Sequence, residues 1–494
     1  MRARPGGWTE TGAIAALWAA GVVHWAFFFG LGRGPAAFSV ADWPKEYRYY
    51  SALREAIRDG RVPYYVTRPI HETRKLLALP ELTWSPQVLL LRVLDVPAFV
   101  TVNTVLLYTA GFAGCLLLRR RYDLSALPFA LLVMLSSFNG HLVAHLAVGH
   151  SMWAGTLLLP LFAYAALELV DDPARARTPL LIALVLFALS MQGAFHALVW
   201  CVLFLLLVAA WHAKRRGAVL RALAWTLALC ACRLVPPAVV LLGRRQQPFL
   251  SGYQAPTDLI EALARLRTVT EPLRGGRFGA LGWWEYDAYV GVAGLVWLVW
   301  FGIVRRVQEA RRAPTASDAA SPAASAFGAA ARARWALDGP ITVMVLLSLD
   351  DLYYPINAAG LPLFSSQRVS SRLLLVPLIL LTVVAAARTQ ADLQVRRRGL
   401  RLALGVAALL TVASLAAHSW TWRVAAVEAA WPPAPHPRDL SIDVREEREE
   451  QTARDRAYVA AVRLSAAVSA GSLAAVAWRL RRLRGRSYGA RRDV

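Results

Sequence analysis

The chain has 494 residues, of which 57% are hydrophobic, and it carries a formal net charge of +23. Its apolar residues form continuous runs separated by short arginine clusters, whereas a soluble protein would spread them along amphipathic elements. Runs of about 17–25 apolar residues are long enough to cross a bilayer as helices. Because the runs lack the two-residue alternation of a barrel strand, the composition predicts an all-α, polytopic transmembrane helical bundle.

Twelve membrane spans are predicted along the chain, which we treat as one transmembrane domain over residues 1–494. The first apolar run is longer than the core of a signal peptide and lacks a small-residue cleavage site, so we expect it to be retained. The predicted spans lie near residues 11–30, 97–118, 124–138, 151–169, 178–191, 196–212, 218–242, 289–304, 336–349, 371–387, 400–418 and 464–479.

Basic residues between alternate spans predict the orientation of the bundle. With the N-terminus inside, six successive turns on the cytoplasmic side are all basic, as the positive-inside rule requires. Those turns carry Arg119–Arg121, Arg175 and Arg177, Lys214–Arg216, Arg305–Arg306, Arg396–Arg398 and the tail from Arg479. Both termini are therefore expected to be cytoplasmic, with long external loops at 31–96, 243–288, 350–370 and 419–463.

Two further features belong to this organisation. The Ala/Ser/Pro-rich segment 313–331 predicts a flexible cytoplasmic linker. The four cysteines all lie in apolar runs, where thiols behave as small hydrophobic side chains, so we expect neither a disulfide nor a cysteine metal site. They are Cys115, Cys201, Cys230 and Cys232.

The first external loop, 31–96, predicts helical structure of its own. Tyr47, Tyr50, Leu53 and Ile57 recur at helical spacing, with charged residues around the rest of the helix. This pattern predicts an amphipathic helix over 43–59 that lies in the membrane interface. A second short helix is expected to begin at the Ser85 N-cap.

Three segments carry a resemblance to a known family. FSVADWPKEY with IRDGRVPYY follows the first span, FNGHLVAHLAVGHSMWAGTLLLPLFAYAALEL runs from the end of the third span through the fourth, and LPLFSSQRVSSRLLLVPL is the arginine-bearing loop that leads into the tenth. Together they resemble GT-C fold membrane glycosyltransferases, most closely the bacterial YfhO-like family. The chain departs from that pattern where Tyr64 and Tyr65 follow Pro63, in place of Trp-Asn-Pro.

The resemblance implies an inverting enzyme at the external face of the bacterial inner membrane. Such an enzyme takes a sugar from a polyprenyl-phosphate donor and transfers it to an envelope polymer, lipid or protein. The reaction needs a base for the acceptor hydroxyl and cations for the departing phosphate. No cofactor is implied, a divalent cation is not favoured, and no nucleic acid partner is expected.

Asp42 is the candidate catalytic base, about a dozen residues beyond the first span. Its alternative role is to cap the helix that follows, because aspartate is a preferred N-cap. Glu46 lies one helical turn later and is either a second acid or a solvent-exposed partner of Arg48 or Arg54. Lys45, between them, is a candidate donor-binding residue.

Arg368 and Arg372 lie four residues apart before the tenth span, so they share a helical face. Arginine binds phosphate in a bidentate manner and stays charged, which suits a lipid-phosphate site. The alternative is that both residues anchor the end of a helix at the membrane surface.

His141, His145 and His150 crowd one external turn. We interpret His141 and His145 as candidate phosphate contacts, the alternative being hydrogen bonding to neighbouring backbone. Metal binding is not favoured because no carboxylate lies near them in the sequence.

Glu285 and Asp287 lie among aromatic residues in GWWEYDAYVG and are further possible acids. Carboxylates beside aromatic rings are common in sugar sites, but aromatic residues at this position also suit a membrane-interface belt.

A different class of function remains open at this stage. Twelve spans with cytoplasmic ends suit a transporter or flippase for a lipid-linked or small polar substrate. The unequal halves and the external placement of the charges weigh against it. A catalytically inactive partner in an envelope complex is a third possibility.

Overall fold

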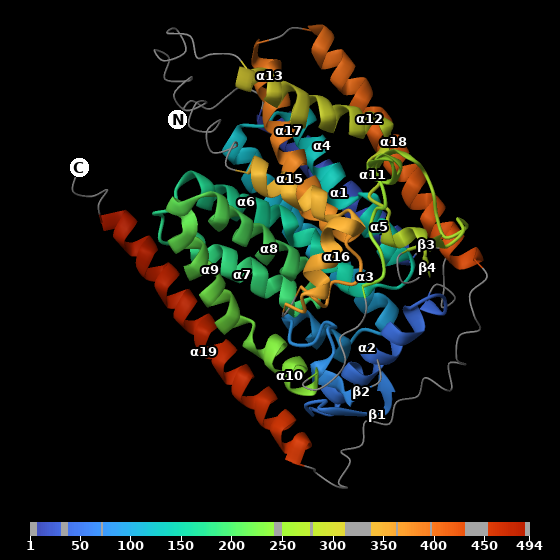
Figure 1. Ribbon diagram of the computed structural model, residues 1–494, viewed down its shortest axis with the longest axis vertical. Coiled ribbons are helices and arrows are strands. Elements are labelled where there is room, and N and C mark those ends of the chain that lie inside the picture. Colours follow the sequence, from blue (N-terminus) through green and yellow to red (C-terminus); the bar gives the residue numbers. More distant parts are fainter. Residues whose placement is uncertain are drawn as a thin grey trace. The chain divides into compact units, whose positions relative to one another are not determined.

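The computed structural model describes residues 7–30, 38–70, 73–241, 249–276, 280–311, 337–361, 364–395, 398–429 and 453–489. The predicted linker 313–331 lies outside these residues. Within them the chain is mostly helical, with two short antiparallel strand pairs (Figure 1). The chain divides into two compact units.

Unit 1 comprises Met1–Trp43, Pro97–Tyr164 and Gln247–Ala434. The helix α17 lies at the centre of this unit and packs against α4, η7 and α15. In its most apolar stretch of 18 residues, 89% of the residues are buried. Its elements are α1 (Gly7–Phe29), α3 (Val96–Tyr122), α4 (Ala126–Ser137), α5 (Gly140–Ala147), η4 (Ser151–Leu158), α11 (Pro256–Ala264), β3 (Arg274–Gly275), β4 (Ala280–Leu281), η6 (Trp283–Glu285), α12 (Gly291–Trp297), the π-helix η7 (Leu298–Val304), α13 (Arg305–Arg311), α15 (Asp338–Leu347), α16 (Asp350–Ala358), η8 (Ser371–Leu374), α17 (Leu375–Val395) and α18 (Arg398–Glu428).

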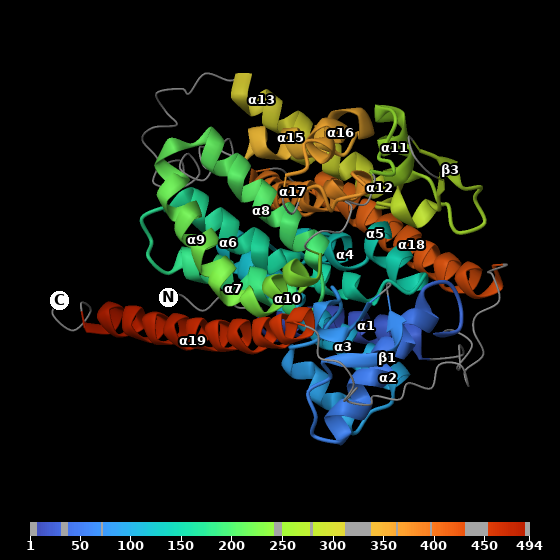
Figure 2. The same ribbon diagram turned by 60° about the horizontal axis from the view of Figure 1, so that its bottom comes forward.

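Unit 2 comprises Pro44–Val96, Ala165–Gln246 and Pro435–Val494. In this unit the long helix α19 runs along α9 and α10 (Figures 1 and 2). Its elements are α2 (Trp43–Arg58), β1 (Tyr65–Ile70), β2 (Thr73–Lys75), η2 (Leu76–Ala78), η3 (Pro86–Arg92), α7 (Thr178–Met191), α8 (Phe195–Trp211), η5 (Ala213–Arg215), α9 (Arg216–Leu229), α10 (Ala231–Leu241) and α19 (Ala453–Gly489). The helix α6 (Leu159–Asp171) contributes residues to both units.

Eight helices in the described part of the chain are long and apolar enough to cross a membrane. The pair α9 and α10, bent by 68° at Cys230, forms a ninth candidate if it counts as one span. The remaining predicted segments are the shorter apolar helices α7, α8 and α15. All twelve predicted segments are thus helical, whereas the count of twelve crossings stays a prediction.

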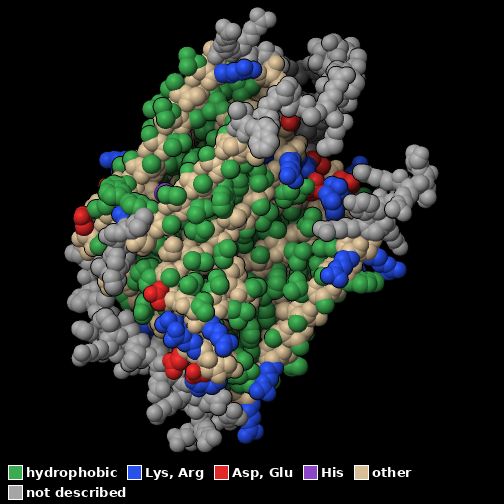
Figure 3. Space-filling view, turned by 180° about the vertical axis from the view of Figure 1, so that it is seen from behind, with side chains coloured by type: hydrophobic (Ala, Val, Ile, Leu, Met, Phe, Trp, Pro, Cys, Tyr) green, Lys and Arg blue, Asp and Glu red, His purple; other side chains and the backbone are tan. Residues whose placement is uncertain are grey.

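The surface also fits a lipid environment. Figure 3 shows apolar side chains over much of one face, with arginine and lysine in separate small groups. In the most apolar stretch of α18, only 22% of the residues are buried. Leu402 and Leu409 on that helix are 72% and 69% exposed. Contiguous exposed apolar surface of this kind is costly in water, so these helices are suited to face lipid.

The first loop contains the predicted helix but buries a different face. The helix α2 spans Trp43–Arg58, close to the expected 43–59. Tyr50 and Leu53 are buried inside the protein together with Glu46 and Tyr49, while Tyr47 and Ile57 are half-buried. The buried face of α2 is therefore rotated from the predicted one and contacts protein. The second expected helix forms as the 3-10 turn η3 after Ser85.

Candidate functional site

Asp42 is positioned by the turn that joins α5 to η4. Its backbone N–H donates a hydrogen bond to the carbonyl of Val148 at 3.0 Å. The next residue, Gly149, has φ of +92°, and a Cβ there would collide with the backbone nitrogen of Trp43. Glycine alone tolerates both conditions, and it lets the two chain segments meet. As a result, Asp42 Oδ2 lies 3.3 Å from His150 Nε2.

The histidines continue this arrangement along α5. The Nδ1 atoms of His145 and His150 are 2.7 Å apart, and the His145 ring stacks on the indole of Trp153 with centroids 4.3 Å apart. His141 lies one turn earlier and meets the Trp153 ring edge-on at 4.9 Å. Both His141 and His145 are buried, so they line the interior side of this group.

Glu285 reaches the histidines from a distant part of the sequence. Its loop is docked on the first residue of α5, where the Gly140 N–H donates to the Tyr289 carbonyl at 2.8 Å. A Cβ at Gly140 would collide with Asp287, so this close approach also depends on glycine. One carboxylate oxygen of Glu285 and a ring nitrogen from each of His145 and His150 all lie within 4.8 Å of one another.

Arg372 joins the group through Glu285. Its Nε and Nη2 donate to the two carboxylate oxygens of Glu285, both at 2.6 Å, in the bidentate geometry that makes such pairs strong. The guanidinium also lies over Trp153, 5.1 Å from the ring centroid. Asp42, His145, His150, Glu285 and Arg372 therefore form one continuous polar cluster in unit 1, which we call the Asp42–Arg372 cluster.

Arg368 lies next to this cluster and is half-buried. Its backbone carbonyl accepts a hydrogen bond from Leu250 N at 2.8 Å, which ties it to the chain just before α11. Burial, and then the neighbouring charge of Arg372, lower the pKa of Arg368, while the charge of Glu285 opposes this shift. An arginine shifted in this way still carries its charge at neutral pH.

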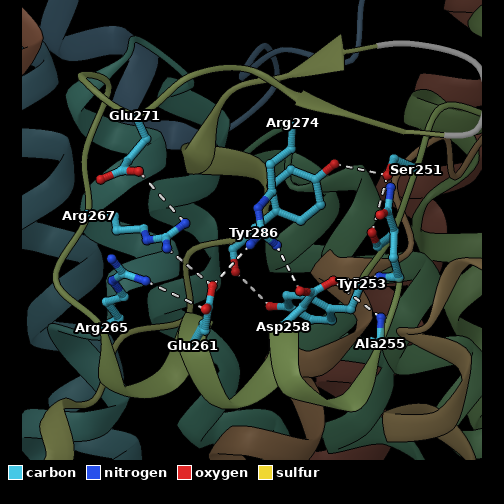
Figure 4. Close-up of polar contacts among 12 residues, drawn as sticks. Ser251, Tyr253, Ala255, Asp258, Glu261, Arg265, Arg267, Glu271, Arg274 and Tyr286 are labelled. Atoms are coloured by element: carbon cyan, nitrogen blue, oxygen red, sulfur yellow. Dashed lines mark hydrogen bonds and ion pairs between the residues drawn. The ribbon is translucent and has the colours of Figure 1, made fainter.

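Charged residues of the second loop form a network of ion pairs, in which Arg274 lies beside the ring of Tyr286 (Figure 4). Arg274 pairs with Asp258 at 3.1 Å and with Glu261 at 3.0 Å. The guanidinium groups of Arg267 and Arg274 lie over the ring of Trp283, at 4.8 and 5.1 Å from its centroid. These contacts hold the chain that leads into Glu285.

The aromatic residues of this loop correct a prediction. Trp283 and Tyr286 are each 2% exposed, and the Tyr253 hydroxyl donates to the Tyr286 carbonyl at 2.7 Å. They therefore form packed core, and they are neither an interfacial belt nor an open platform for a sugar. Aromatic residues that stack on arginines inside a loop have the same sequence pattern as a belt.

Asp287, another candidate acid, lies in an enclosed pocket of hydrogen bonds. Its Oδ2 lies 2.9 Å from His418 Nε2 and accepts from Trp422 Nε1 at 2.9 Å, and its Oδ1 accepts from the Tyr289 N–H. The side chain is fully buried, so it has no surface at which to receive an acceptor hydroxyl. This arrangement favours a structural role.

Lys45 and Glu46 belong to unit 2, where they pair with each other at 2.9 Å, and Lys45 also lies 3.8 Å from Glu81. Glu46 is fully buried, so the expected solvent exposure of this carboxylate is wrong. A carboxylate at this depth requires a cation close by, which Lys45 supplies.

Sequence reasoning misses His150 as a central residue, together with Trp153. The sequence signal for His150 is the Gly149 before it, because a glycine in a left-handed conformation often marks a close approach of two segments. The contribution of Glu285 cannot be seen locally, since more than a hundred residues separate it from the histidines.

The described helices and the composition define a class: a polytopic, mostly helical membrane protein. No protein-family model matches the chain, and a search of curated proteins finds no significant relative. The function is therefore argued from the Asp42–Arg372 cluster itself.

Proposed function

We propose that the protein is a membrane glycosyltransferase of the GT-C type, which transfers a sugar from a polyprenyl phosphate to an envelope acceptor. The observation that carries this proposal is the Asp42–Arg372 cluster. It combines a carboxylate that is 49% exposed with Arg372, which is fixed by a carboxylate and an indole, and Arg368 lies beside it. A base and phosphate-binding cations are the two groups that this reaction requires.

In the proposed reaction, the acceptor hydroxyl oxygen forms a new bond to the anomeric carbon of the sugar. The bond from that carbon to the phosphate oxygen breaks, and the electron pair leaves with polyprenyl phosphate. Asp42 takes the hydroxyl proton, while Arg368 and Arg372 stabilise the charge that develops on the departing phosphate. His150 holds the Asp42 carboxylate in position through its Nε2–H.

The proposal places the cluster outside the membrane and requires twelve crossings with both termini in the cytoplasm. The support is the series of six basic turns between the predicted spans. Single cysteines introduced after Arg121 and Arg398 should react with a membrane-impermeant reagent only from the cytoplasm, and one at Gly275 only from outside. Cytoplasmic labelling at Gly275 would contradict the external site.

The functional test compares Asp42→Asn with Arg368→Ala in the full-length protein reconstituted in nanodiscs. Asp42→Asn keeps the shape but removes the base, so transfer from a panel of radiolabelled polyprenyl-phosphate hexoses should fall by roughly 10²–10⁴. Binding of polyprenyl phosphate should survive this change, whereas Arg368→Ala should weaken it. Asp59→Asn, at an exposed carboxylate in unit 2, and Arg265→Ala are matched controls that should leave both measurements unchanged.

Two outcomes would overturn the proposal. One is full transfer by the Asp42→Asn protein. The other is a wild-type protein that transfers no sugar but moves the intact polyprenyl-phosphate sugar across the vesicle membrane, which is the result expected of a flippase.

A further inference from the structure

We propose that His145, His150 and Glu285 bind a divalent metal ion, for which Zn²⁺ is the best match. One ligand atom from each residue lies within 4.8 Å of the other two, and the three come from α5, the start of η4 and η6. Two histidines and one carboxylate form a known three-ligand set for zinc, which leaves a coordination position open. The sequence around the histidines does not predict this ligand set, because Glu285 lies far away in the chain, in the loop 243–288.

The contact with Asp42 sets which nitrogen of His150 can bind a metal. Asp42 Oδ2 lies 3.3 Å from His150 Nε2, and a carboxylate there favours the tautomer with its proton on Nε2. The lone pair of His150 is then on Nδ1, which accepts a hydrogen bond from His145 Nδ1 at 2.7 Å, and a bound metal ion would take the place of that proton. A carboxylate that orients a ligating histidine is the usual second partner in metal sites, so Asp42 is the positioning residue of this site.

The ion pair of Glu285 is compatible with coordination. An ionised carboxylate has about four lone-pair sites on its two oxygens. Arg372 occupies one direction at each oxygen through its 2.6 Å hydrogen bonds, so one oxygen can also bind a metal. Ligating carboxylates are commonly held by hydrogen bonds in this way, and the Trp153 ring further fixes Arg372.

The balance of charge gives the metal a purpose, and this step rests on the proposed function. Asp42 and Glu285 carry two negative charges, which cancel the two positive charges of Arg368 and Arg372 when the histidines are neutral. The cluster alone therefore offers no net positive charge to a phosphate. A divalent ion between the histidines and Glu285 would supply it, because a bound ion is often the largest local charge in a site.

Metal binding itself is measured without any donor or acceptor. The purified full-length protein, freed of its affinity tag and treated with a chelator, is titrated with Zn²⁺ in nanodiscs. The metal retained after desalting is counted by mass spectrometry. We expect one Zn²⁺ per chain for the wild type and none for His150→Ala, His145→Ala or Glu285→Gln. Asp42→Asn should keep the stoichiometry but weaken the affinity by roughly 10–100-fold.

Control measurements separate ligand loss from misfolding. His212→Ala removes a histidine of unit 2, outside this cluster, and should bind zinc as the wild type does. Co²⁺ provides a second readout, since its visible absorption reports coordination by nitrogen and oxygen ligands and should disappear in Glu285→Gln. Thermal unfolding in nanodiscs checks that each variant is folded.

The outcomes distinguish this inference from the proposed function. A wild type that retains no Zn²⁺ or Co²⁺, or a folded His150→Ala protein with wild-type zinc content, overturns the metal site even if sugar transfer is found. One zinc per chain that depends on these three residues supports the site even if transfer is absent.

Discussion

Each unit contains one cluster of charged residues, and the two clusters differ in whether their hydrogen-bond partners are backbone or side-chain groups. In unit 2, the buried Arg233 donates to the carbonyls of Leu79, Glu81 and Ser190 and to Thr83 Oγ1. Its partners are therefore mainly backbone acceptors, and it ties the first loop to α7. In unit 1, the members of the Asp42–Arg372 cluster contact one another through their side chains.

The difference in exposure agrees with this contrast. Arg233 is 6% exposed, and the nearby Tyr49 is buried with its hydroxyl 2.6 Å from Thr83 Oγ1. Burial raises the pKa of Tyr49, so it stays protonated, as a structural hydrogen-bonding group does. Asp42, by contrast, is half-exposed at the edge of its cluster. A charge that satisfies backbone acceptors favours a structural role, whereas side chains that meet beside solvent favour binding or catalysis.

The largest effect that tests this comparison is expected from Arg233→Met. The substitution leaves buried carbonyls and the Thr83 hydroxyl without their donor, so stability should fall by about 3–5 kcal/mol. Thermal and denaturant unfolding in detergent micelles would measure it. Arg221→Met, at an exposed arginine of α9, is the matched control and should change stability by less than about 0.5 kcal/mol.

Activity provides the second half of the same comparison. Below its unfolding temperature, the Arg233→Met protein should transfer sugar and bind zinc at wild-type levels per folded molecule. A selective loss of either activity in a stably folded variant would show that the charges of unit 2 serve function, and the contrast between the clusters would fail.

Much of the fold follows from the sequence because helix length and apolar composition are local properties. All twelve predicted segments are helical, and α2 begins and ends close to its predicted limits. The face of α2 was harder to predict. Glu46 reads as a surface residue by composition, yet it is buried because Lys45 lies 2.9 Å away in the folded protein.

For the candidate site too, the residue types could be predicted from the sequence, but their arrangement could not. Asp42, Arg372, His145 and Glu285 are suggested by residue type and by their place next to predicted spans. Their assembly depends on long-range contacts, such as the docking of the Glu285 loop on Gly140. Residue type also misleads for Asp287, whose acidic side chain is enclosed by His418 and Trp422 from α18. Tertiary partners decide that Asp287 is enclosed by α18 while its neighbour Glu285 pairs with Arg372 beside the histidines.

The smaller expected effect concerns the glycine that brings Asp42 to His150. Gly149→Ala places a Cβ on a residue with φ of +92° and against the backbone of Trp43. Strain of this kind costs about 1–3 kcal/mol, and relief of the collision should move Asp42 away from His150. We therefore expect reduced thermal stability together with lower sugar transfer and weaker zinc binding.

Gly60→Ala is the matched control for this prediction, because Gly60 has φ of +67° but open space where the Cβ would lie. It should show the cost of the left-handed backbone alone, about 1 kcal/mol, with transfer and zinc binding unchanged. The difference between the two variants isolates the contact at Trp43. If Gly149→Ala lowers stability no more than Gly60→Ala and leaves zinc affinity intact, the turn does not position Asp42, and the exposed carboxylate must be held by other contacts.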